Sequence, residues 1–190
     1  LESELTQTGQ QVNSLDESRQ ALQARLDDAA ARAQARVDST LAVRDDIASQ
    51  LAGAGITSAA VSSVEDDSAV AITLGSGDLY GVGSASLSKT GTELLGGVGE
   101  IVAGYPEWRV DVEGHTDSQG IGAVLREKYP TNWELSTARA SAAVRYLSSR
   151  TGIDPEKISA RGFADTQPVA SNESSSGREQ NRRVEIILRR

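Results

Sequence analysis

The stretch EGHTDSQG, residues 113–120, gathers side chains that can bind, catalyse or hold a metal. It contains His115, the single histidine of the chain, and Asp117 two residues later. It overlaps WRVDVEG, residues 108–114, whose alternation of apolar and polar residues predicts a half-buried strand. Polar groups at a strand end are compatible with catalysis, metal binding or ligand recognition.

Catalysis is the least supported of these. A nucleophile would need a Ser or Thr held by the imidazole of His115, and no G-x-S-x-G motif occurs. Glu113 and Asp117 are an alternative carboxylate pair for a hydrolase, because side chains four apart in an extended segment point the same way. We expect no catalytic residue, and we expect His115 to be a hydrogen-bonded structural residue.

The sequence also argues against a metal or a cofactor. There is no cysteine and only one histidine, which leaves few ligands for zinc or iron. The glycine-rich stretch GSGDLYG, residues 75–81, departs from the G-x-G-x-x-G pattern, and no Walker lysine follows it. We therefore expect no bound cofactor or metal, and we expect residues 75–86 to form a loop.

Asp117 and Arg139 are the strongest pair of candidates. Asp117 follows a predicted strand, and Arg139 lies on or beside the apolar stripe of a predicted helix over 132–149. A partly buried arginine needs a carboxylate. The two residues either pair with each other and hold the loop, or face one pocket and bind the two ends of a zwitterion.

Charge and hydropathy exclude some partners. The formal net charge is -8, and residues 1–55 and 56–190 each carry about half of it. Without a cluster of Lys and Arg, nucleic acid is not expected as a partner. No run of about 20 apolar residues is present. Because the first residue is Leu1 and not Met, we expect a processed or excised piece, with any membrane anchor upstream.

Residues 1–52 predict a long helix, since they contain no proline and a single glycine. Their apolar residues follow a heptad-like 3/4 spacing that shifts after Ala33; they are Leu1, Leu5, Val12, Leu15, Leu22, Leu26 and Ala29. This pattern indicates either a coiled coil that joins two copies into a dimer or a solvated spacer helix. Residues 53–67 are interpreted as a linker.

Residues 68–190 alternate predicted strands and helices. Strands are expected at 68–74, 108–114, 158–163 and 182–188, with helices at 88–103 and 132–149. The order indicates an α/β (α+β) domain in which helices layer a mixed sheet. Polar loops are expected at 115–131 and 171–180.

Four blocks resemble the OmpA/MotB C-terminal domain family, particularly its MotB-like members, over about residues 79–188. They are VDVEGHTDSQG, YPTNWELSTARASAAVRYL, ISARGFADTQPVASN and GREQNRRVEIIL. The resemblance implies a βαβαβ-type mixed sheet. It also implies non-covalent binding of peptidoglycan through the diaminopimelate of its stem peptide.

The motifs carry the family's ligand residues onto this chain. The resemblance implies that Asp117 binds the diaminopimelate ammonium and Arg139 its carboxylate. Further pocket residues are then expected, with the two arginines of NRR nearby: Thr116, Asn132, Leu135, Arg182 and Arg183. Tyr80 and Gly81 stand where the family commonly has Phe and Asp.

The same resemblance implies a periplasmic protein that anchors a membrane or envelope complex to the cell wall. A MotB-like stator subunit of an ion-driven motor is one expected host, and an outer-membrane lipoprotein that tethers the envelope is the alternative. A cell-wall hydrolase is a third and weaker interpretation. In each case a membrane partner would be reached through a segment upstream of Leu1.

Overall fold

A computed structural model describes residues 2–64, 66–81 and 84–190. Leu1 of the predicted heptad and residues 82 and 83 of the predicted glycine-rich loop lie outside the described residues. Helix α1 (Glu2–Gly53) is shared by two compact units, Leu1–Ser39 and Thr40–Arg190. No helix within the described ranges is both long and apolar enough to cross a membrane.

The first unit consists of α1 residues whose described side chains are exposed almost throughout. Large apolar side chains of this unit remain in solvent, including Leu15 at 69% and Leu26 at 64% exposure. Exposed ion pairs between Arg and Asp three or four residues apart contribute little to helix stability. The apolar seam of this part of α1 therefore has no partner within the described chain.

The second unit is built on one five-stranded sheet with the order β1-β2-β5-β3-β4. Strands β3 and β4 are parallel, whereas β5 is antiparallel to both β2 and β3. The mixed sheet predicted from the sequence is thereby confirmed. The strands are β1 (Ala60–Val64), β2 (Ala69–Gly75), β3 (Arg109–Gly114), β4 (Ile158–Gly162) and β5 (Arg183–Arg189).

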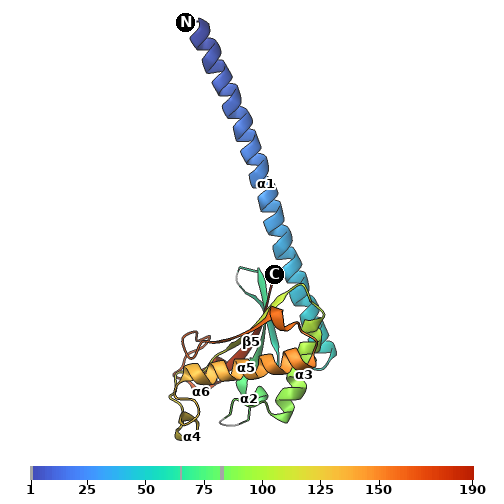
Figure 1. The fold of residues 1–190 in the computed structure, drawn as a ribbon, viewed down its shortest axis with the longest axis vertical. Coiled ribbons are helices and arrows are strands. Elements are labelled where there is room, and N and C mark those ends of the chain that lie inside the picture. Colours follow the sequence, from blue (N-terminus) through green and yellow to red (C-terminus); the bar gives the residue numbers. More distant parts are fainter. Residues whose placement is uncertain (1, 65, 82–83) are drawn as a thin grey trace. The chain divides into compact units, whose positions relative to one another are not determined.

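Helices α3 (Lys89–Ala103) and α5 (Asn132–Arg150) cover one face of the sheet (Figure 1). Alternate residues of β2, β3 and β5 point to this face and form the core with both helices. Ile47 and Leu51, near the end of α1, belong to the same core. The core is mainly Val, Leu, Ile and Ala, as the low aromatic content requires.

Several predicted loops contain short elements. The range 53–67 holds β1, which pairs with β2 through a turn where Asp66 and Asp67 adopt positive φ. Three predicted loops contain short helices, which are α2 (Ser76–Leu79), α4 (Ala123–Arg126) and α6 (Ser175–Asn181). A short turn helix, η1 (Pro155–Lys157), precedes β4. Hydrophobic periodicity does not detect helices of this length.

The start of α5 is specified locally. Thr131 caps the helix, and the Glu134 side chain accepts a hydrogen bond from the Thr131 backbone N–H at 2.8 Å, which completes a capping box. Two glycines let α5 approach the ends of β3 and β4. A Cβ on Gly114 would lie 2.3 Å from the Ser136 carbonyl oxygen, and one on Gly162 would be equally crowded. This contact places α5 beside the residues that follow β3.

Candidate functional site

Asp117 lies three residues after β3 and is buried, with 6% exposure. Its Oδ2 forms an ion pair of 2.6 Å with Nη1 of Arg182, which comes from the junction of α6 and β5. Its Oδ1 accepts a hydrogen bond from the backbone N–H of Gln119 at 2.9 Å. The carboxylate is thus held by one arginine and by its own loop.

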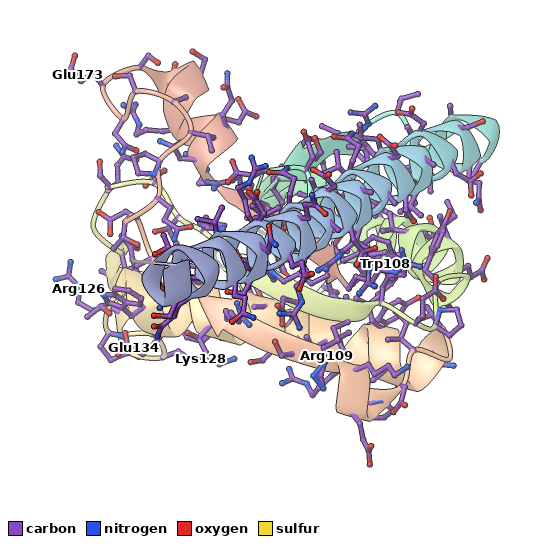
Figure 2. The ribbon with its side chains drawn as sticks, turned by 90° about the horizontal axis from the view of Figure 1, so that it is seen from above. Trp108, Arg109, Arg126, Lys128, Glu134 and Glu173 are labelled. Carbon is purple, nitrogen blue, oxygen red and sulfur yellow. The ribbon has the colours of Figure 1, made fainter. Side chains whose placement is uncertain are left out.

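Asn132, the first residue of α5, connects the helix to this loop. Its side-chain amide donates to the carbonyl oxygens of Asp117 and Gln119, each at 3.2 Å. A cavity of about 300 Å³ borders Asn132 and is also lined by Arg126 and Asp165. Arg126 marks the position of this cavity in Figure 2, where it lies with Lys128 and Glu134 at one end of the domain and Trp108 lies toward the other.

Arg139 lies two turns along α5 from Asn132 and is half-buried. Its Nε donates to the Ser84 carbonyl oxygen at 3.2 Å, and its guanidinium lies over the Tyr80 ring, 5.3 Å from the centroid. Burial lowers the pKa of Arg139 from its ordinary value. Arg139 forms no ion pair with any residue the structure describes.

Spacing left open whether Asp117 pairs with Arg139 or whether both face one pocket. Asp117 does not pair with Arg139, because Arg182 occupies its Oδ2. The two residues are nevertheless within electrostatic range, since Asp117 and Arg182 both perturb the pKa of Arg139. Arg139, which has no described carboxylate partner, and the ion pair of Asp117 with Arg182 therefore lie in one region.

The other predicted site residues have different surroundings. Thr116 is buried, and its Oγ1 has no hydrogen-bond partner among the described residues, although its backbone N–H donates to the Ala164 carbonyl oxygen at 2.8 Å. Leu135 packs with Ala85 and Ile121 in a small apolar cluster. Ala85 follows the glycine-rich stretch, so this contact brings Ala85 against one predicted pocket residue.

Arg183 is not directed at Asp117. Its Nε pairs with Glu185 at 2.6 Å, and its Nη1 donates to the carbonyl oxygens of Gln167 and Asn181. Successive residues of a strand point to opposite sides. Only Arg182 of the NRR motif therefore contacts the Asp117 carboxylate.

Tyr80 is a contact that sequence reasoning did not predict. Its hydroxyl donates to the Arg139 carbonyl oxygen at 2.7 Å, and its ring supports the guanidinium of the same residue. Burial raises the pKa of Tyr80, so the phenol stays neutral. The residues are 59 apart in the chain. The one available signal was the family resemblance, which implies a Phe where Tyr80 stands.

His115 differs from its expected role. It is buried at 1% exposure and stacks on Phe163 with ring centroids 5.4 Å apart, but neither ring nitrogen has a hydrogen-bond partner in the described part of the chain. The prediction that the His115 side chain is hydrogen-bonded is therefore wrong. Burial, followed by the charge of Arg183, lowers the pKa of His115 to about 4.

The expected alternative of a Glu113 and Asp117 catalytic pair also finds no geometric support. Glu113 Oε1 faces Arg189 at 3.3 Å and Arg161 at 3.6 Å, whereas Asp117 pairs with Arg182. Each carboxylate thus has its own arginine partners. An acid and base that share one substrate would need to face a common space.

Comparison with known proteins agrees with this architecture. The sequence model of the OmpA family matches residues 79–182, which is more than half of the chain. The chain belongs to the OmpA family. A solved structure described as the cell wall anchor of the T6SS from Pseudomonas aeruginosa superposes with a TM-score of 0.66 at 34% identity, covering 76% of this chain and 97% of that one.

Two curated OmpA-type relatives are similar over most of the same region. Motility protein B of Bacillus subtilis is 30% identical over 62% of this chain and 44% of its own length. Peptidoglycan-binding protein ArfA of Mycobacterium tuberculosis is 33% identical over 64% of this chain and 35% of its own length. The chain therefore spans less than half the length of either relative.

Proposed function

We propose that this chain anchors an envelope complex by binding peptidoglycan non-covalently, through the diaminopimelate of the stem peptide. The relatives support this proposal, because one is named as peptidoglycan-binding and a structural neighbour is described as a cell wall anchor. The observation that carries the proposal is Arg139. It presents a half-buried guanidinium with no carboxylate partner among the described residues, close to the Asp117 carboxylate.

The chemistry of the ligand suits this pair. Diaminopimelate carries an ammonium and a carboxylate on one carbon. Arg139 would take the carboxylate with two parallel hydrogen bonds, and Asp117 would take the ammonium. Each charge-assisted hydrogen bond contributes about 1.5–3 kcal/mol. Two fixed opposite charges select against peptides that lack the zwitterion, since one buried charge would then remain unpaired.

Binding requires one rearrangement. Arg182 pairs with Asp117 Oδ2, but its side chain is 41% exposed, so the ion pair is partly screened by solvent. We infer that Arg182 turns from Asp117 toward the ligand carboxylate and joins Arg139 there. The unpaired Oγ1 of Thr116 supplies a further hydrogen bond. Asn132 keeps the loop in place, and Leu135 forms the apolar wall.

The α1 seam suits a second copy of the chain. A dimer through residues 1–39 would cover the exposed Leu15, Leu22 and Leu26. Two joined domains bind one polymer more durably than either alone, because the second contact is intramolecular. We place the domain in the periplasm, on a MotB-like stator subunit or an envelope lipoprotein with a membrane partner outside this chain.

Co-sedimentation with purified sacculi tests this function. The wild-type chain should pellet with sacculi, and Asp117→Ala should stay in solution. Arg145→Ala is a control on α5, because the Arg145 side chain is exposed and has no described contact. Normal pelleting of folded Asp117→Ala would defeat the proposed site. We expect no catalysis, and release of soluble muropeptides by the wild type would instead indicate a hydrolase.

A further inference from the structure

The sheet face opposite α3 and α5 carries a second cluster of polar residues. Glu113 of β3 and Glu185 of β5 are directly opposite each other in the antiparallel register. His115 follows two residues after Glu113, and its backbone N–H donates to the Arg183 carbonyl oxygen of β5 at 2.9 Å. One potential ligand atom from each of these side chains lies within 4.8 Å of the others.

The imidazole of His115 makes no hydrogen bond to any residue that the structure describes. Its side chain is buried, yet neither Nδ1 nor Nε2 has a hydrogen-bond partner in the described part of the chain. Buried polar groups are normally paired, so an unpaired one requires an explanation. The stacking on Phe163 satisfies the ring faces and leaves both nitrogens unpaired.

Both glutamates contact arginines through one carboxylate oxygen only. Arg189 and Arg161 lie at 3.3 and 3.6 Å from Glu113 Oε1, and Arg183 lies at 2.6 Å from Glu185 Oε1. The described ion pairs and hydrogen bonds of both side chains end on Oε1, so each carboxylate retains Oε2 to coordinate a cation. Like charges directly opposite in a sheet are destabilising, and a cation between them removes that cost.

We propose that Glu113, His115 and Glu185 form a binding site for a divalent transition-metal ion of the zinc type. One imidazole nitrogen and two carboxylate oxygens are ligands that zinc accepts, and a water molecule completes four-coordination. The arginines would act as outer partners that orient the carboxylates, as hydrogen-bonded groups around metal ligands usually do.

The charges of the cluster set the expected strength. Asp111 also pairs with Arg161 and Arg189, so three carboxylates already face three arginines. A divalent ion adds two positive charges to a balanced group, and binding is therefore weaker than at a structural zinc site with thiolates. The ion would hold β3 to β5 immediately before Thr116 and Asp117.

The composition of the chain makes the test direct. There is no cysteine and one histidine, so an untagged protein labelled with ¹⁵N-histidine gives the imidazole nitrogens of His115 alone. Zinc is titrated into the EDTA-treated chain and followed by NMR and calorimetry. We expect saturable binding of one ion, a shift of one ring nitrogen, and a higher thermal unfolding midpoint.

Two matched variants separate a coordinated ion from general attraction. Glu185→Gln removes a proposed ligand, keeps an oxygen for Arg183, and should lower zinc affinity at least about tenfold. Asp111→Asn removes the same charge from the same arginine network without touching a ligand, and should retain the His115 shift. An unshifted His115 at saturating zinc, or equal binding by folded Glu185→Gln, would overturn the proposal. Neither result bears on peptidoglycan binding.

Discussion

Arg139→Ala gives the sharpest test of how this chain recognises its ligand. The half-buried guanidinium has no described carboxylate partner, so its main role is predicted to be in the bound state. Each charge-assisted hydrogen bond contributes about 1.5–3 kcal/mol, so losing both bonds from Arg139 should weaken the affinity for a diaminopimelate stem peptide by at least roughly 10- to 150-fold. Arg139→Lys keeps the charge but loses the two parallel bonds, and should bind with intermediate affinity.

The same substitution should have a modest effect on folding. The alanine variant loses one hydrogen bond to the Ser84 carbonyl and the contact with the Tyr80 ring. It also removes the desolvation cost of a partly buried charge, which offsets part of that loss. We expect the free energy of unfolding to fall by no more than about 2 kcal/mol.

Calorimetric titration and urea unfolding of the same samples measure both quantities. Arg145→Ala removes the same charge from the exposed side of α5 and should leave affinity and stability unchanged. A structural role for Arg139 would produce the opposite result, namely a large loss of stability with unchanged affinity in the folded fraction. That outcome would refute the assignment of Arg139 as the carboxylate ligand.

Three further predictions address the framework. Gly114→Ala should lower the free energy of unfolding by at least about 2 kcal/mol in urea, because its Cβ would meet the Ser136 carbonyl; unchanged stability would contradict this packing. Hydrogen bonds from Thr131 lower the pKa of Glu134, so the stabilisation is present above pH 4.5 and is lost as pH falls through the lowered pKa. The stability difference between wild type and Glu134→Gln should therefore disappear in acid, whereas a constant difference would exclude this cap effect. Leu22→Lys should weaken self-association in analytical ultracentrifugation, and identical sedimentation of a dimeric wild type and the variant would rule out the α1 seam.

Local patterns were sufficient for the main elements of the second unit. The alternation in residues 108–114 predicted β3, and the sequence TNWE contains the capping box that starts α5. These features depend on neighbours within a few residues, so they are visible in one dimension. Helices of four to seven residues, such as α2 and α6, were not predicted, because they contain too few turns to show a period.

The sequence by itself determined the family, the mixed sheet and the strand end that carries Asp117. Only the tertiary structure decided which acidic and basic side chains form ion pairs. Arg182, 65 residues from Asp117, takes its carboxylate and leaves Arg139 without an ion pair in the described chain. The physical reason is that an ion pair depends on loop paths and rotamers, and several arginines compete for each acid. The same long-range packing buried His115 against Phe163, where neither ring nitrogen meets a hydrogen-bond partner among the residues that the structure describes.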